Sequence, residues 1–154
     1  MPLYDTEFGK KWSDTVSESL PQDIIDWVNV EKSKIAKYNC SEYCAGIFAS
    51  GRIYEGATFQ ICGESQRAIA ARATYALANK IDPVNFPWVS PYSDGWWDIN
   101  NVVLASTTTV DGFLAFAKNI SDYCSACAKC CRDHKSAVTP ENCATYDFSA
   151  GWPE

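Results

Sequence analysis

The sequence predicts a mixed α+β domain, an α/β sandwich in which an antiparallel sheet is packed on one face by two helices, with an extra N-terminal helix. Three observations lead to this fold class. The chain has 154 residues, 47% of them hydrophobic, with six tryptophans, which suffices for one sizeable core. Helical and β-rich patterns alternate along it. Eight cysteines indicate a disulfide-stabilised fold. We therefore treat residues 1–154 as a single cysteine-rich domain.

The first part of the chain combines an arm, a helix and β-rich runs. Residues 1–18 are polar with scattered aromatics and predict an extended N-terminal arm. A helix over about 20–37 follows, because Ser19 can cap it, Pro21 suits its first turn and apolar residues recur on one face. Over residues 43–62, short β-rich runs separated by glycine-containing pairs predict a hairpin or meander.

The middle of the chain predicts a second helix and a loop. Residues 64–81 are rich in alanine, the best helix former, and small side chains let a helix lie flat on a sheet. Residues 82–97 hold three prolines among aromatic residues, which predicts a stiff loop. A strand is expected over 98–105.

The last part of the chain predicts a long amphipathic helix. It begins after a capping signature formed by Thr108 and Asp111. Its apolar positions recur with a helical period. The expected buried stripe consists of Phe113, Phe116, Ala117, Ile120, Cys124, Cys127 and Cys131. A final edge strand is expected over 143–148.

The cysteines divide into two groups of four. Cys124, Cys127, Cys130 and Cys131 fall in the long helix, and Cys40, Cys44, Cys62 and Cys143 lie elsewhere. A helix points its side chains outward in parallel, so cysteines on one helix cannot easily pair with each other. Pairing between the groups leaves about 24 of roughly 105 arrangements. The alternatives are free thiols, an iron–sulfur cluster or a zinc site that includes His134. The even count without a second Cys-x2-Cys pair favours disulfides and no metal.

The net charge and two short motifs limit which partners and which cellular compartment are compatible with the sequence. The net charge of −6 argues against nucleic acid as a partner, because phosphate binding needs clustered Lys and Arg. No apolar run approaches the length of a membrane span. Asn39-Cys40-Ser41 and Asn119-Ile120-Ser121 match the glycosylation acceptor pattern. Together with the cysteines, these motifs predict a secreted, extracellular glycoprotein.

The tryptophan-rich loop is the best candidate for a binding surface. Its aromatic side chains could offer flat apolar faces to sugar rings or to a membrane interface. These are Trp88, Tyr92, Trp96 and Trp97. The alternative is that Trp88, Trp96 and Trp97 close the end of the sandwich.

Catalytic signals are weak. Asp94 and Asp98 bracket two tryptophans, as paired carboxylates do in glycosidases, but an Asp-Gly pair is also ordinary turn chemistry. His134 is the only histidine, which excludes a two-histidine mechanism, and Asp133 beside it provides no triad geometry. We expect no catalytic residue and no cofactor.

Two segments resemble the small secreted killer toxins of fungi that have an α/β-sandwich fold. One is the strand ending in Ile61-Cys62-Gly63. The other is the helix from about residue 110 through Tyr123-Cys124-Ser125-Ala126-Cys127. Together they cover about a third of the chain. The N-terminal helix, the tryptophan-rich loop and the acidic charge depart from that family, so no functional residue of the family is carried over.

The resemblance implies a secreted, non-enzymatic killer-toxin-like or effector protein that acts on competing or host cells. Its expected partner is a cell-surface glycan, membrane or receptor, and a second subunit is left open. One alternative is a secreted glycan hydrolase or glycan-binding module that uses the loop 86–98, with Asp94, Asp98 or Glu64 as catalytic groups. Another is a ligand carrier with an apolar pocket, which the β-rich middle of the chain argues against.

Overall fold

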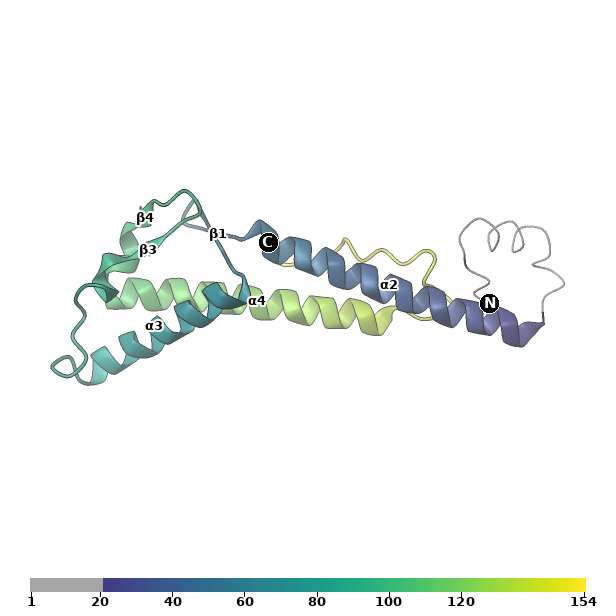
Figure 1. The fold of residues 1–154 in the computed structure, drawn as a ribbon, viewed down its shortest axis with the longest axis horizontal. Coiled ribbons are helices and arrows are strands. Elements are labelled where there is room, and N and C mark those ends of the chain that lie inside the picture. The colour runs from purple at the N-terminus through teal and green to yellow at the C-terminus, as the bar shows by residue number, and fades with distance from the viewer. Residues whose placement is uncertain (1–20) are drawn as a thin grey trace.

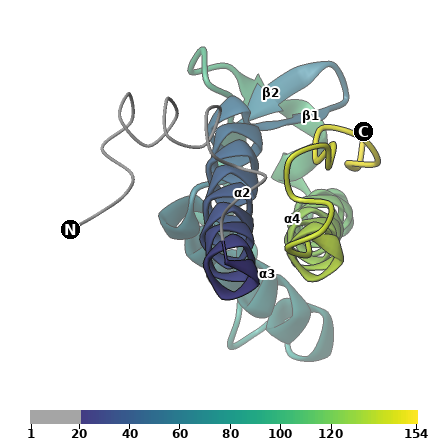
Figure 2. The ribbon, with the colours of Figure 1, turned by 90° about the vertical axis from the view of Figure 1, so that its right-hand side faces the viewer.

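The computed structural model describes residues 21–154, which form an elongated molecule built on three α-helices. Helices α2 (Gln22–Ser50) and α4 (Val110–Ala137) lie side by side and antiparallel, and α3 (Gly63–Ile81) crosses the first half of α4 (Figures 1 and 2). The strands are β1 (Arg52–Tyr54), β2 (Ala57–Phe59), β3 (Trp96–Trp97) and β4 (Val103–Leu104). The mixed class of helices and strands is confirmed. The predicted arm over 1–18 and the Ser19 cap lie outside the described residues.

The strands pair as two separate hairpins. β1 pairs antiparallel with β2, with Arg52 opposite Phe59, and β3 pairs antiparallel with β4, with Trp96 opposite Leu104. Within residues 21–154 these two ladders stand where we expected one sheet. The alanine-rich helix α3 packs against α4 and does not lie flat on a sheet. Packing helix on helix is another way to bury the apolar stripe that a helix presents.

Helix α2 extends well beyond the expected 20–37. It continues through residues 43–48, which we assigned to a β-rich run. Cys40, Cys44 and Phe48 are spaced by four residues, so they share one helical face, and Phe48 packs against the core. This packing outweighs the β-propensity of a short apolar run. Helix α2 ends at Gly51, whose φ of +81° and a Cβ position 2.6 Å from the Phe59 carbonyl oxygen require glycine.

Helices α3 and α4 agree closely with the sequence. The expected range 64–81 matches α3 to within one residue. All seven residues of the expected α4 stripe are buried. The cap of α4 is Thr109 and not Thr108, because the Thr109 hydroxyl accepts a hydrogen bond from the Gly112 backbone N–H at 3.1 Å. That bond satisfies one of the unpaired N–H groups of the first turn.

The strand expected over 98–105 is mostly a turn. The Asp98 carboxylate oxygen Oδ1 accepts hydrogen bonds from the backbone N–H groups of Asn100 and Val102, both at 2.8 Å. Asn101 adopts a φ of +60°. These features close the β3–β4 hairpin, because Asp and Asn readily form such side-chain turns. The edge strand expected over 143–148 is absent from the described chain, and these residues lie in the C-terminal segment 138–154.

The core lies at one end of the molecule, between α3, the first half of α4 and the hairpins. The Phe59 and Phe116 rings meet edge to face with centroids 4.9 Å apart. The largest fully buried hydrophobic side chains here are Phe59, Ile61, Phe113, Phe116 and Ile120. Toward the other end, α2 and α4 face each other through cysteines, and the C-terminal segment runs back along them (Figure 1). Apolar side chains therefore stabilise one end of the molecule, and cysteines line the helix interface toward the other end.

Candidate functional site

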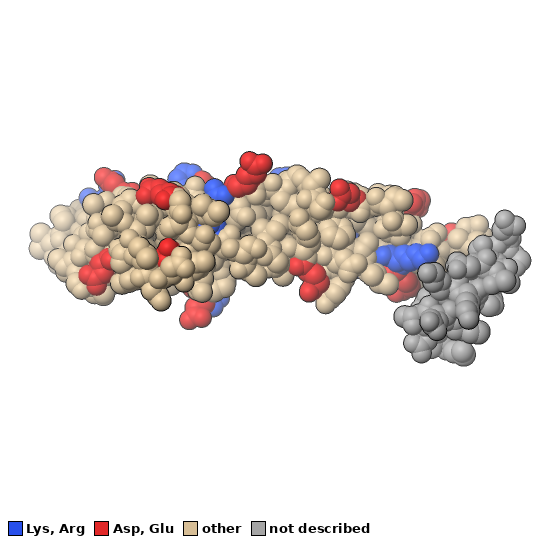
Figure 3. Space-filling view, turned by 90° about the horizontal axis from the view of Figure 1, so that it is seen from above, with Lys and Arg blue, Asp and Glu red and all other residues tan. Residues whose placement is uncertain are grey.

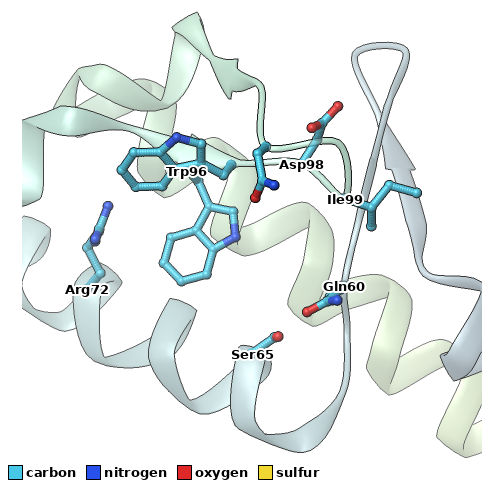
Figure 4. A pocket seen from close by; sticks show the side chains of 8 residues that line it. Gln60, Ser65, Arg72, Trp96, Asp98 and Ile99 are labelled. Atoms are coloured by element: carbon cyan, nitrogen blue, oxygen red, sulfur yellow. The ribbon is translucent and has the colours of Figure 1, made fainter.

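An open pocket of about 370 Å³ lies where the tryptophan-rich segment meets the start of α3 (Figure 4). Its walls come from the link between β2 and α3, from α3 itself, and from β3 with the turn that follows it. The lining residues are Gln60, Ser65, Arg72, Trp96, Trp97, Asp98, Ile99 and Asn101. The volume falls within the range of small-molecule sites.

The two neighbouring tryptophans of β3 have different surroundings. Side chains alternate between the two faces of a strand. The Trp96 ring packs against the core, with its centroid 6.0 Å from Phe113 and 6.3 Å from Phe116. Trp97 is 47% exposed. The strand thus anchors one indole in the core and presents the other to the pocket and the solvent.

Arg72 fixes the back of the pocket. Its Nη1 donates a hydrogen bond to the Gly95 carbonyl oxygen at 2.8 Å. Its guanidinium carbon lies 5.0 Å from the centre of the Trp96 ring, which is a favourable cation–π distance. Burial lowers the pKa of the Arg72 guanidinium, and the nearby Asp94 carboxylate opposes this shift. Arg72 therefore ties α3 to β3 and orients the Trp96 ring.

Polar side chains border the exposed indole. Within residues 21–154, the side-chain amides of Gln60 and Asn101 form no hydrogen bond, so their donors and acceptors are open to a ligand. The Ser65 hydroxyl lies 3.3 Å from the Cys62 sulfur, at the start of α3. Figure 4 shows Ser65 and Arg72 on α3 facing the segment that carries Trp96. The pocket thus combines an aromatic face with neutral polar groups.

The carboxylates do not form an acid–base pair across this pocket. Of Glu64, Asp94 and Asp98, only Asp98 lines it. The Asp98 carboxylate is directed away from α3 (Figure 4), and its Oδ1 is occupied by the two backbone N–H groups of its own turn. Asp94 Oδ2 accepts a hydrogen bond from the Ser90 hydroxyl at 3.0 Å. Turn formation and loop closure account for both aspartates.

Two of the four predicted binding aromatics lie away from the pocket. The Trp88 Nε1 donates a hydrogen bond to the Thr108 carbonyl at 2.8 Å, and its ring packs on Phe113. Tyr92 stacks on Tyr75 with centroids 3.8 Å apart. Trp88, like Trp96, joins the border of the core, as the alternative reading of these rings expects. The structure therefore brings Trp96 and Trp97 together in one pocket, without Trp88 and Tyr92.

The structure holds all eight cysteines as thiols, so the expected disulfides stay a prediction. Cys40, Cys44, Cys127 and Cys131 lie between α2 and α4. Cys124 belongs to the core, and Cys62 is exposed at the start of α3. The Cys130 and Cys143 thiols donate to carbonyls of the C-terminal segment. In the described chain, no group of three or more His, Cys, Asp or Glu residues is placed to bind a metal ion.

The remaining sequence candidates have structural partners or lie exposed. The two His134 ring nitrogens contact the C-terminal segment, with Nδ1 2.8 Å from the Tyr146 hydroxyl and Nε2 2.9 Å from the Ala150 carbonyl. Asn39 is exposed on α2. Asn119 Oδ1 accepts a hydrogen bond from Arg52 Nε at 3.2 Å. His134 therefore serves as an anchor for the C-terminal segment.

Charged side chains are spread over the surface. On the face shown in Figure 3, acidic and basic groups are interspersed along the molecule. Within residues 21–154, four ion pairs of lysine with aspartate or glutamate join exposed side chains. None of the described helices is apolar over a length that could span a bilayer.

Comparisons with protein-family models, with curated proteins and with solved structures find no match to this chain. The pocket is therefore interpreted from its own chemistry.

Sequence reasoning located part of the pocket and missed the rest. Trp96, Trp97 and Asp98 were singled out by their aromatic and acidic density. Gln60, Ser65, Arg72 and Asn101 were not. No local pattern identifies these four, because α3 and the turn after β3 meet only in the folded chain.

Proposed function

We propose that the protein is a non-enzymatic binding protein whose pocket at Trp97 takes a sugar residue of a cell-surface glycan. The observation that carries this proposal is the exposed Trp97 indole beside the open side-chain amides of Gln60 and Asn101. A sugar ring has an apolar face that stacks on an indole and hydroxyl groups that hydrogen-bond to amides. The pocket offers both kinds of contact in one place.

The pocket is preorganised for such a ligand. Trp96 anchors β3 to the core, and Arg72 ties β3 to α3. The exposed ring therefore sits on a supported strand, which limits the entropy lost on binding. Neutral polar groups at the rim suit a neutral ligand for a protein with a net charge of −6.

We extend the proposal to the role of the protein. A secreted, acidic protein with eight cysteines and two glycosylation acceptor patterns would act outside the cell. Glycan recognition would then bring it to the surface of competing or host cells, as in the killer-toxin-like or effector role expected from the sequence. We also propose that disulfide bonds between the cysteines stabilise this fold.

Binding to soluble oligosaccharides tests the first proposal. Trp97→Ala should weaken the affinity for a bound glycan about tenfold or more, because an aromatic anchor at a site centre contributes well over 1 kcal/mol. Trp27→Ala is the matched control, since Trp27 has the same 47% exposure and lies on α2 outside the pocket. Titration calorimetry with both variants measures the difference.

Three results would contradict the proposal. No wall or host glycan binds, Trp97→Ala binds as well as the native protein, or the two variants lose affinity equally. Release of reducing ends that Asp98→Asn abolishes would instead establish the hydrolase alternative. A growth-inhibition assay on susceptible cells, with Trp97→Ala beside the native protein, tests the role.

A further inference from the structure

We propose that the interhelical cysteine cluster, Cys40, Cys44, Cys127 and Cys131, forms two disulfides that link α2 to α4. The pairs are Cys40 with Cys131 and Cys44 with Cys127. This assignment does not depend on the proposed glycan site. It selects one pairing for four of the eight cysteines. The sequence alone leaves this pairing open.

The spacing of the four cysteines is the first support. Cys44 follows Cys40 by four residues on α2, and Cys131 follows Cys127 by four residues on α4. Four residues are about one helical turn, so each pair lies on one face of its helix, one turn apart. Because α2 and α4 run antiparallel (Figure 1), the two faces can match in reverse order.

Two contacts fix the register of α4 against α2 and β1. The Cys40 sulfur lies 3.9 Å from the Cys131 carbonyl oxygen. Arg52 Nε donates to Asn119 Oδ1 at 3.2 Å. Arg52 comes twelve residues after Cys40, and Asn119 comes twelve residues before Cys131, so one antiparallel register satisfies both contacts. In that register, Cys44 is level with Cys127.

The thiols lie close enough to affect one another's titration. Cys131 is among the groups that raise the pKa of Cys40 and of Cys44. The Cys44 sulfur is also close enough to Cys127 for a like-charge effect between the two thiolates. Cys40, Cys127 and Cys131 are buried. The sulfur atoms thus form one compact layer between the helices.

The crossed arrangement fits this register poorly. Cys44 lies close to Cys131 as well as to Cys127. Pairing Cys44 with Cys131, however, would leave Cys40 and Cys127 offset by one helical turn, about 6 Å along the axis. That offset adds to the separation between the helices and exceeds the span of a disulfide. Pairs within one helix are excluded by the parallel side-chain directions. The level pairing is the one that joins all four.

The oxidation requires a disulfide oxidant, either a protein or a small molecule, of the kind that an oxidising compartment supplies. One protein thiolate attacks the oxidant and forms a mixed disulfide, which releases one thiol. The partner cysteine then attacks the mixed disulfide and releases the second thiol. For each bond, two electrons and two protons pass from the cysteine pair to the oxidant.

Peptide mapping of the full-length secreted protein tests the pairing. Free thiols are first blocked with iodoacetamide, and the unreduced protein is cut with trypsin and with a glutamate-specific protease. Glu42 separates Cys40 from Cys44, and Lys129 separates Cys127 from Cys131. We expect residues 38–42 linked to 130–132 and residues 43–52 linked to a fragment that contains Cys127. Cys130→Ser and Cys124→Ser variants should keep these links, which assigns each one to Cys131 and Cys127.

A thermal measurement accompanies the map. Reduction should lower the melting temperature by about 10 °C, because each cross-link restricts the unfolded chain. Cys62→Ser is the matched control, and it should leave the two interhelical links in the map unchanged. Alkylation of any of the four cysteines in the native protein, a crossed map, or a stoichiometric metal ion would overturn the proposal.

Discussion

At the residue scale, the same change from glycine to alanine meets opposite surroundings in two helices. A Cβ at Gly112, in the first turn of α4, would lie 1.8 Å from the Ser106 carbonyl oxygen. A Cβ at Gly46, inside α2, meets no atom within 4 Å. Close approach of the segment before α4 explains the first glycine. The second has no steric reason in the structure.

We predict that Gly112→Ala destabilises the protein by about 1–3 kcal/mol, because the new methyl group must displace backbone. Gly46→Ala should stabilise it by about 0.5–1 kcal/mol, because alanine is the better helix former. Urea unfolding of both variants measures these changes. Equal stability of the two variants would show that the segment before α4 yields without cost.

The Cys62 thiol is the most reactive of the eight if it stays reduced. It is exposed at the start of α3, and the hydrogen bond from the Ser65 hydroxyl lowers its pKa. The buried thiols of Cys40, Cys124 and Cys127 and the partly buried thiol of Cys44 have raised pKa values, in each case mainly because of desolvation. The thiolate is the nucleophile, so exposure and pKa both favour Cys62.

We predict that iodoacetamide labels Cys62 first in the reduced, folded protein, and that Ser65→Ala slows this labelling near neutral pH. Mass spectrometry after short exposures identifies the labelled residue. Ser93→Ala is the control, because Ser93 lies outside α3. If Ser65→Ala leaves the rate of Cys62 unchanged, the hydroxyl is not what activates the thiol.

At the element scale, the C-terminal segment 138–154 is held by aromatic contacts and by His134. The His134 ring stacks on Trp152 with centroids 5.4 Å apart, and Tyr43 of α2 contacts both Phe148 and Trp152. Figure 2 shows the segment lying over α4. The segment thus contacts both α2 and α4.

We predict that His134→Ala loosens residues 146–154 and leaves the core unchanged. Both ring-nitrogen contacts and the stacking on Trp152 would be lost. Hydrogen exchange should become faster in this segment but not at Phe113 to Ile120 of α4. His134→Gln could keep one hydrogen bond and should show a smaller effect. Unchanged exchange in the segment would mean that its other contacts, such as those with Tyr43, Arg52 and the Cys130 thiol, hold it without His134.

The sequence predicted an element correctly where the residue pattern within that element was strong. The stripe of α4 and the alanines of α3 carry a strong helical period, and both helices agree with the structure. The prediction missed the second half of α2 because Ile47 and Phe48 look like a short β-rich run. The spacing of Cys40, Cys44 and Phe48 on one helical face was not recognised. The turn after Asp98 was missed because the apolar residues Ile99, Val102, Val103 and Leu104 suggested a strand. Pocket residues from α3 could not be assigned, because nothing local relates them to Trp97.

At the scale of the whole molecule, the buried thiols couple the stability of the reduced protein to alkaline pH. Burial, with hydrogen bonding to Cys131, raises the pKa of Cys44 from 9.0 to about 11. A thiol whose folded pKa is raised contributes stability that is complete below the unfolded pKa. That stability is lost as the pH rises through the folded pKa.

We predict that the free energy of unfolding of the reduced protein falls from about pH 9 to about pH 11. The fall should be smaller in Cys44→Ala, where this group no longer titrates. It should also be smaller in oxidised protein if the interhelical disulfides form. Urea unfolding across this pH range, with and without reductant, measures both effects. Tyr54 and Tyr123, whose pKa values burial also raises, would account for a fall that is identical in all three samples.

The sparse burial along α2 has a practical consequence for handling the protein. Only Ser33 and Cys40 are buried among its 29 residues. A helix with so few buried residues unfolds locally at a small free-energy cost once its disulfides or aromatic contacts are lost. Lys32, Lys34 and Lys37 would then be the first places where a contaminating endopeptidase nicks the backbone. The fragment that carries α3, α4 and the hairpins would survive such a cut.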